Sequence, residues 1–578
     1  DINTVRGQET GYATLNPLDM RPSTALSNGN LTVTGGGDAW YLARSTQFLT
    51  TGKYYWEYKW YGNIIDGNNG TQAGLKTPTS TLTAAAEQTG SFAFQYTSIY
   101  QTAGSTNTVS VSPGSITPGD CVMFAYDADA GLMWFGVNGI WNDGANPALG
   151  TNSDWTSLPT TGLAPFAGVY GTAIKMDLNF GQKPFKYAPP DGFQPVNTAN
   201  TRPAKVISRP DQYFGVITYV GAGATKTFTG LNFGDVPDLV WMKNRDRTSY
   251  GDGTSAHHYL YDTVRGTGTG KMLTPSTNEA EGSKSTEADL DGFVRDGFRL
   301  DAASGTDCIN NSGDDFIAWC WKAGGNKGTF NVDDVGYASA AAAGLSGQSS
   351  NITINGCSIG TKQGFSIVKV TPSDNSAFIV PHGLSQQPDF LIIKNLGAAQ
   401  NWDIYFRGVT GSTQVFELNT DLALTTTGVT VWNTVDSTKV SARGASFATS
   451  NNPRVVYFWH SVPGFSKFGT YEGNGNADGP FIELGFRAAV IIAKNVDNAD
   501  DWVIADITRS SYNPQDETLF PNSTNGEDTG TFYIDILSNG FKPRHSSGKW
   551  NSSGHTFIYA AWAEAPSIDL YGGGANAR

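Results

Sequence analysis

The sequence predicts an all-β protein built from several domains, and three observations carry this prediction. The chain has 578 residues, which is too long for one hydrophobic core. Aromatic residues make up 12% and charged residues only 16%. Short apolar runs rich in aromatic and β-branched residues alternate with turns rich in Gly and Asn, and the chain contains 69 glycines. This pattern is typical of strands joined by tight turns.

The charge balance excludes several partners. Lys plus Arg is 38 against 52 Asp plus Glu, which gives a net charge of −14. Binding to nucleic acid or to an anionic membrane surface requires a cationic face, so we expect neither partner. No apolar stretch approaches 18 residues, and we therefore expect no membrane insertion. The four cysteines form no CxxC pair, and we expect buried free thiols.

The first domain is predicted over residues 1–198. Its clearest strands are KYYWEYKWY (53–61), SFAFQY (91–96), DCVMFAYD (120–127) and LMWFGVNGIW (132–141). In the last run, Asn138 and Gly139 stand between apolar segments, which predicts a two-residue type I′ hairpin because both residues tolerate positive φ. The Pro-rich stretch 186–203 is predicted to be an extended linker.

The order of motifs in this part of the chain resembles that of SPRY domains. The resemblance rests on GKYYWEY (52–58), FAYDADAGLMWFGVNGIW (124–141), PFAGVYG (165–171) and LNFGQKPFKYAPPDGF (178–193). It covers most of the first 195 residues. A SPRY domain is a bent β-sandwich that recognises proteins through loops on one surface. The resemblance therefore implies a binding module that is not an enzyme.

The rest of the chain consists of three related segments. A Lys-Asn pair follows an apolar strand in each: Lys243-Asn244, Lys394-Asn395 and Lys494-Asn495. Similar apolar phrases end the segments, namely FIAWCWKAGG (316–325), VVYFWHSVPG (455–464) and FIYAAWAEAP (557–566). Repeats of this size are each large enough to form a domain. We predict sandwich-like β-rich repeats over 206–325, 365–464 and 465–578, with 326–364 as a linker or surface extension.

A second motif recurs in two of the three segments. Asp262 and Arg265 have the same spacing and apolar lead-in as Asp506 and Arg509, whereas the middle segment has Phe406 and Arg407. Duplication favours a structural ion pair or a braced turn. Duplicated catalysis is the alternative, and the different spacing in the middle segment weakens both interpretations.

Residues 214–566 resemble tail-fibre-like and other virion proteins of tailed bacteriophages. The resemblance rests on PDLVWMKNR (237–245), YDTVRG (261–266), the Asn-Ser-Gly turn before the last strand, and AWAEAP (561–566). In such proteins these phrases often follow a SPRY-like module. The resemblance implies an origin in the virion and display on its surface.

Few residue patterns in the sequence indicate a catalytic, metal-binding or ligand-binding site. The DxDxG of Asp127, Asp129 and Gly131 lacks the other oxygen ligands of an EF-hand and predicts a turn, and we expect no metal and no cofactor. Carboxylate pairs at 314–315, 289/291 and 500–501 adjoin Gly or Asn turns, which favours local hydrogen bonding over glycoside hydrolysis. The best candidate ligand-binding residues lie in the hairpin turn and just past it: Asn138, Trp141, Asn142 and Asp143. Aromatic rings beside Asn and Asp suit sugars and protein hot spots, although Trp141 packed within a strand is the alternative.

These observations predict a non-enzymatic virion protein, a tail fibre or spike whose loops recognise a glycan or protein receptor on the host. Its other partners would be virion proteins and copies of itself, and the resemblance to phage fibres implies that a trimer is the oligomer to test. Weak sites gain strength when several are linked, which suits an adhesin built from repeats. The alternatives are a head decoration or other appendage without a receptor, and a polysaccharide depolymerase.

Overall fold

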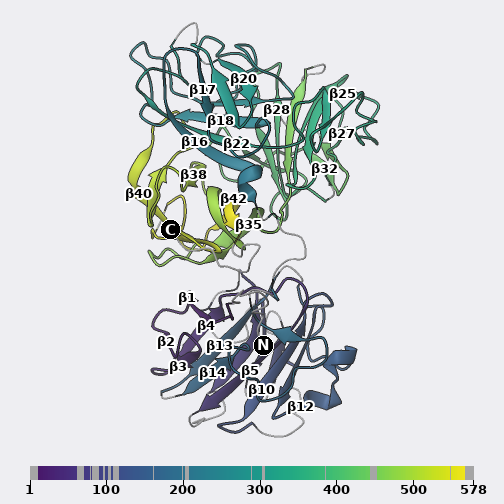
Figure 1. Ribbon diagram of the computed structural model, residues 1–578, viewed down its shortest axis with the longest axis vertical. Coiled ribbons are helices and arrows are strands. Elements are labelled where there is room, and N and C mark those ends of the chain that lie inside the picture. Colours follow the sequence, from purple (N-terminus) through teal and green to yellow (C-terminus); the bar gives the residue numbers. More distant parts are fainter. Residues whose placement is uncertain are drawn as a thin grey trace. The chain divides into compact units, whose positions relative to one another are not determined.

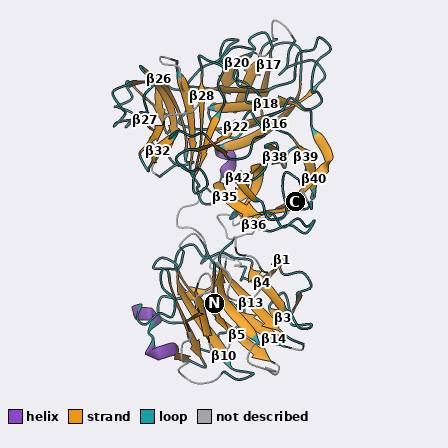
Figure 2. Cartoon of the chain, turned by 180° about the vertical axis from the view of Figure 1, so that it is seen from behind, coloured by secondary structure: helices purple, strands orange, loops and turns teal. Residues whose placement is uncertain are grey.

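The computed structural model describes residues 11–566 except 62–69, 79, 81, 83–89, 96–97, 102–105, 108–115, 160–161, 173, 198–199, 202–206, 208, 288, 303–305, 385, 443–451 and 547. The chain divides into two compact units, one within Asp1–Ala204 and the other within Lys205–Ser567. Strands and three short 3-10 helices, η2 (Asn142–Gly144), η3 (Pro147–Leu149) and η4 (Pro210–Gln212), are the only regular elements among the described residues (Figure 2). The fold is all-β, as predicted.

The first unit contains two sheets. One has the order β1 (Leu15–Met20), β4 (Trp40–Ser45), β13 (Ala164–Tyr170), β6 (Thr71–Lys76), β7 (Ser91–Gln95), β8 (Ser98–Gln101), β9 (Thr106–Asn107). The other has the order β12 (Ile140–Trp141), β11 (Leu132–Val137), β10 (Cys121–Asp127), β5 (Lys53–Tyr61), β14 (Lys175–Asn179), β3 (Thr32–Thr34), β2 (Ala25–Ser27), with β15 (Gln194–Pro195) added to β5. Aromatic rings from both sheets meet in the core, where Phe94 and Phe135 stack at 4.5 Å.

The local predictions for this unit are largely confirmed. Asn138 and Gly139 have φ of 48° and 89°, and they join β11 to β12 as the type I′ turn requires. The Asp127 carboxylate accepts the N–H groups of Asp129 and Ala130, so the DxDxG stretch is a turn. The predicted linker at 186–203 begins too early. Its first part belongs to the sandwich, because Glu57 accepts the N–H groups of residues 186 and 187, and β15 pairs with β5.

In the second unit, each repeat contains four strands that pair in the same order; they form a whole sheet in the first and third repeats and part of a larger sheet in the second. These strands are β16 (Phe214–Val220), β22 (Asp315–Trp321), β18 (Leu239–Asn244), β19 (His258–Asp262); β26 (Phe365–Pro372), β34 (Arg454–Trp459), β28 (Phe390–Asn395), β29 (Asp403–Phe406); and β35 (Ser466–Glu472), β42 (Thr556–Pro566), β37 (Phe486–Asn495), β38 (Val503–Asp506). The closing strand lies in the middle of each sheet. The apolar phrase therefore recurs because it forms the same central strand three times.

A second sheet covers one face of each four-stranded sheet. These smaller sheets are β17 (Lys226–Thr229), β21 (Gly297–Leu300), β20 (Leu290–Val294); β27 (Phe378–Pro381), β33 (Lys439–Ala442), β32 (Trp432–Val435); and β36 (Ile482–Glu483), β41 (Gly540–Pro543), β40 (Asp528–Leu537), β39 (Gln515–Thr518). Each repeat is therefore a sandwich with its own core.

Residues 326–364 extend the second repeat. They form β23 (Phe330–Val332), β24 (Val335–Tyr337) and β25 (Ile352–Gly360), and β25 pairs with β26. On the other edge of this sheet, β30 (Gln414–Glu417) and β31 (Thr425–Thr426) continue it beyond β29, which makes nine strands. The segment is thus a surface extension that completes a sheet.

The uncovered faces of the three four-stranded sheets meet in one shared core. Along β18, Leu239 and Trp241 enter this shared core, while Val240 and Met242 face the repeat's own core. The same alternation occurs in β28 and β37. A cavity of about 20 Å³ at the junction is lined by side chains from all three repeats. Figure 1 shows the repeats of this unit as teal, green and yellow lobes grouped around that core. Because the strands are buried on both faces, their sequences are continuously apolar.

Candidate functional site

The four predicted ligand-binding residues run from the turn between β11 and β12 through β12 into η2, but most of their polar groups are already engaged. Asn138 donates to the Asp120 carboxylate at 2.7 Å and accepts the N–H of Cys121 at 3.1 Å, so its side chain holds the turn. Asn142 is buried and donates to Asp154 at 2.7 Å. Burial raises the pKa of Asp154 to about 6. Asn142 therefore stabilises the loop from its buried side and does not face solvent.

The outer surface of this loop is formed by the other two predicted residues and by apolar neighbours. Trp141 is half-buried and contacts Tyr55 edge to face at 6.3 Å, so only part of its ring faces solvent. Asp143 is exposed. Ile140 and Leu149 are 57% and 75% exposed. Exposed apolar and acidic side chains therefore occur along this stretch, from β12 to η3.

The Lys-Asn pairs are buried, and each half has a distinct role. The asparagine carboxamide oxygen accepts the backbone N–H two residues later in every copy, at Asp246, Gly397 and Asp497. Asparagine therefore forms the turn that ends the strand. The lysine before it points to the other side, where it reaches the neighbouring repeat.

Each lysine binds a main-chain carbonyl of the repeat before it. Lys394 of the second repeat donates to the carbonyl of Asn278 at 2.8 Å. Lys494 of the third repeat reaches Asp421 at 3.2 Å, and Lys243 of the first repeat reaches Thr524 of the third at 3.1 Å. The contacts therefore run from first to second, second to third and third back to first. The three repeats form a closed ring.

Backbone hydrogen bonds follow the same cycle. The carbonyls of the residues directly after the Lys-Asn pairs accept N–H groups from the preceding repeat: Leu396 from Glu281, Val496 from Leu424, and Arg245 from Glu527, at 2.7–3.0 Å. We call these contacts the first, second and third seams. Three equivalent contacts on three seams indicate an approximate threefold arrangement within one chain.

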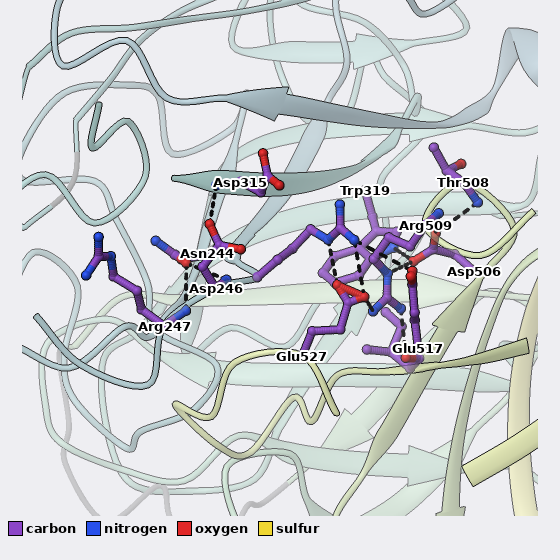
Figure 3. A network of polar contacts seen from close by, with 12 residues as sticks. Asn244, Asp246, Arg247, Asp315, Trp319, Asp506, Thr508, Arg509, Glu517 and Glu527 are labelled. Carbon is purple, nitrogen blue, oxygen red and sulfur yellow. Dashed lines mark hydrogen bonds and ion pairs between the residues drawn. The ribbon is translucent and has the colours of Figure 1, made fainter. Parts of the chain in front are cut away.

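The duplicated Asp and Arg form buried ion pairs at the first and third seams. The distances are 2.5 Å for Arg265–Asp262 and 2.6 Å for Arg509–Asp506, and all four side chains are fully buried. Each aspartate also accepts a hydrogen bond from the next repeat: Asp262 from the Tyr457 hydroxyl, Asp506 from the Trp319 indole. Each arginine contacts a glutamate, Glu281 or Glu527. The structural interpretation of the motif is confirmed, and Figure 3 shows the third seam.

The second seam replaces this polar set with apolar side chains at every position. Phe406 stands in place of the aspartate, and three residues later Val409 stands in place of the arginine. Leu424 replaces the glutamate, and Ala560 occupies the strand position of Trp319 and Tyr457. Phe406, Val409 and Leu424 all pack against the shared core. Buried charges are stable only with their partners, so the whole set is present or absent together.

Arg407 was compared with Arg265 in the sequence, and that comparison is wrong. The N–H of Arg407 donates to the carbonyl of Asp389, as the N–H of Thr263 donates to that of Asp238. Arg407 therefore corresponds to Thr263. Its guanidinium is half exposed and contacts the Asp389 carboxylate at 3.2 Å on the surface.

The seam lysines give the protein a distinctive pH dependence. Burial lowers the pKa of Lys243 and Lys394 to about 7 and that of Lys494 to about 8, from 10.5. Between these values and 10.5, the unfolded chain binds more protons, so the free energy of unfolding rises with pH. We expect a higher Tm at pH 9.5 than at pH 7.5, measured by differential scanning calorimetry. Lys394→Met should reduce the rise, whereas the exposed Lys362→Met should not; an equal rise in both variants would contradict this assignment.

At least one member of each predicted carboxylate pair makes local contacts, whereas one buried oxygen of Asp289 has no hydrogen-bond partner among the described residues. Asp314 binds Arg247 and Asn244, and Asp500 accepts from Asn495. Asp501 binds Asn522 and Lys549, while Asp291 contacts Arg299. These side chains brace turns and strand ends, as their Gly and Asn neighbours predict.

A different carboxylate pair emerges at the third seam. Glu517 lies near Glu527 (Figure 3). Arg245 of the first repeat contacts Glu517 at 3.6 Å and Glu527 at 2.6 Å. Burial, and then the charge of Glu527, raises the pKa of Glu517 to about 7. The sequence holds a signal for Glu527, because Ser-Thr-Asn precedes a glutamate at 276–281 and again at 523–527. Glu517 has no such signal.

The first unit holds a buried Lys76–Ser91 pair that sequence patterns do not reveal. The two residues oppose each other on β6 and β7, and the Lys76 ammonium donates to the Ser91 hydroxyl. Burial, with a smaller effect of Arg44, lowers the pKa of Lys76 to about 7. A lysine with a lowered pKa beside a serine is a combination found in nucleophilic catalysis. Both side chains are fully buried, however, so the pair has no access for a substrate and acts within the core.

The described residues offer little other chemistry. All four cysteines are free and buried, as predicted. In the part of the chain that the structure describes, no three His, Cys, Asp or Glu side chains gather as metal ligands would. Across the same residues, no helix has both the length and the apolar character needed to cross a bilayer.

Comparisons with known proteins cover both units. The family model described as Domain of unknown function (DUF7483) matches residues 209–566. No curated protein matches the chain. Matching solved structures include the SPRY domain of human HERC1, with 19% identity, a TM-score of 0.25, and coverage of 29% of this chain and 99% of that one. The TRIM65 PSpry domain (14% identity, TM-score 0.21, 29% and 92% covered) and a human SPRY domain (14%, 0.23, 28% and 97%) also match.

Proposed function

The chain belongs to the family described as Domain of unknown function (DUF7483), and we propose that it is a bacteriophage virion protein that binds a host-surface receptor without chemically changing it. It acts as a tail fibre or spike on the surface of the particle. The closed ring of three repeats is the observation that supports this proposal most. A ring with a shared core holds its peripheral loops rigidly, and loops on a rigid β scaffold are where recognition residues are usually found.

The placement of the ionisable groups supports binding over catalysis. Groups with strongly shifted pKa values often mark catalytic sites, but ion-pair networks shift pKa values as well. Here the seam lysines bind carbonyls of the adjacent repeat, and the buried aspartates bind arginines. Their roles are accounted for by joining the repeats. The proposal therefore includes no enzymatic activity.

The decisive experiment compares binding to two targets. The purified full chain, labelled with a fluorophore, is mixed with intact host cells and separately with phage heads that lack this protein. An adhesin binds the cells in a saturable manner and is competed by unlabelled protein. Binding to heads alone would replace the proposal with a decoration role. Imaging virions with and without the protein then locates it on the particle.

The same samples test the depolymerase alternative. Host capsular polysaccharide or lipopolysaccharide is incubated with the protein, and chain length is followed by gel electrophoresis. We expect no shortening. Shortened chains, confirmed with a heat-denatured control, would overturn the non-enzymatic proposal. The mass of the protein in solution, measured by light scattering, tests the predicted trimer.

A further inference from the structure

The second repeat carries an open groove on its surface. The groove has a volume of about 730 Å³ and lies between the loop after β26 and the segment from β31 to β32. This volume is within the range of small-ligand sites, roughly 300–1,000 Å³. The groove is lined by Asn375, Ser376, Ala377, Val429, Thr430 and Asn433.

Both rims of the groove are held by hydrogen bonds. On one side, the Asp374 carboxylate accepts the Asn351 amide at 2.9 Å and the N–H of Ser376 at 2.8 Å. On the other side, the Thr427 hydroxyl donates to the carbonyl of Thr413, and the carbonyl of Ser412 accepts the N–H groups of residues 431 and 432. The groove therefore exists before any ligand arrives, and binding requires little ordering of these loops.

The lining matches one chemical class of ligand. Among the described residues that line the groove, none carries a charged side chain, so an anionic or cationic ligand would lose its hydration without gaining a counter-charge from them. Carboxamides donate and accept hydrogen bonds at once, as a hydroxyl-rich ligand requires. Asn375 and Thr430 make no side-chain hydrogen bond to any described residue, and both are exposed. Val429, 47% exposed, supplies an apolar surface beside them.

We infer that this groove binds uncharged sugar residues of a host-surface glycan. The inference rests on the proposed function and specifies its ligand: a neutral oligosaccharide whose hydroxyls pair with Asn375, Thr430 and Asn433 while a C–H face contacts Val429. The Asn433 side chain is available for this role, because its internal contact with Ser441 is long, at 3.5 Å. The second repeat is then the recognition module, and the other repeats hold it in place.

The test uses the full chain and an array of neutral, sialylated and sulfated oligosaccharides. The double variant Asn375→Ala/Thr430→Val removes two polar groups that have no side-chain hydrogen bond to a described residue, so the fold should be unaffected. Loss of two ligand hydrogen bonds weakens binding by roughly 5- to 150-fold. Thr426→Val, an exposed threonine outside the groove lining, is the matched control and should bind as the unaltered protein does. Thermal unfolding of each variant checks the fold.

The outcomes separate this inference from the proposed function. Selective binding to neutral glycans that only the double variant loses supports both. If the double variant still binds host cells and neutral glycans normally, or if charged glycans are preferred, the groove assignment is overturned and the adhesin proposal stands. If the unaltered protein binds neither cells nor glycans, the proposed function itself is overturned.

Discussion

Arg265→Met lowers the free energy of unfolding of the unit within 205–567 by about 3–5 kcal/mol, the cost of leaving a buried charge without its partner. Arg265 and Asp262 are both fully buried, and among the described residues the other side-chain partner of Asp262 is the Tyr457 hydroxyl of the neighbouring repeat. Without the arginine, the carboxylate must remain charged in a dry environment or take up a proton. The first seam suits this test because its aspartate–arginine pair lies apart from the extra Arg245–Glu517 contact of the third seam. Urea denaturation followed by tryptophan fluorescence measures the loss.

Two controls make this result specific. Arg407→Met removes a half-exposed ion pair on the second repeat and should change stability by less than about 1 kcal/mol. The exchange Asp262→Phe/Arg265→Val/Glu281→Leu/Tyr457→Ala copies the second seam onto the first. It should recover most of the stability lost in Arg265→Met, because an apolar set replaces the whole polar set. A fourfold variant as unstable as the single one would contradict the equivalence of the seams.

Trp562→Ala should lower stability by roughly 3–5 kcal/mol and weaken all three repeats together. Its ring lies 5.3 Å from that of Trp321 in the first repeat and 6.1 Å from that of Trp459 in the second. Removing it opens a cavity where the three sheets meet, and no single repeat can repack that space alone. Calorimetry of the variant should show one transition for the unit within 205–567, shifted to lower temperature.

The alternative outcome is that the three repeats unfold independently of one another. In that case Trp562→Ala would lower one transition and leave two others unchanged. Limited proteolysis gives a second view, because a shared core predicts that the three repeats become sensitive to trypsin at the same temperature. Phe532→Ala, which removes a half-buried ring at the edge of the third repeat's own core, is the control for a change confined to one repeat.

Much of the fold follows from the sequence alone. Apolar runs bounded by Gly and Asn predict strands, the Asn138-Gly139 pair predicts its turn, and the repeated phrases predict three copies of one strand order. These features depend on neighbours within about ten residues, and local patterns encode such neighbours directly. The turn formed by the Asn of each Lys-Asn pair is also predictable from local sequence, since this side chain accepts the N–H group two residues later. The contact made by the lysine is not, because the carbonyl that it binds in the neighbouring repeat is 73 to 281 residues away.

Other properties required the tertiary structure. A continuously apolar strand predicts that both faces of its sheet are buried. The sequence pattern does not show which face packs against the repeat's own small sheet and which packs against the other repeats. Only the folded chain shows that Val409 replaces Arg265, that Asn142 lies inside its loop, and that residues 326–364 complete a sheet. The groove of the second repeat likewise joins residues some 55 apart. The sequence by itself determined the strands and turns of each repeat. Only the tertiary structure decided which side chains join the repeats, because the partner of a buried charge or indole is close in space but distant in the sequence.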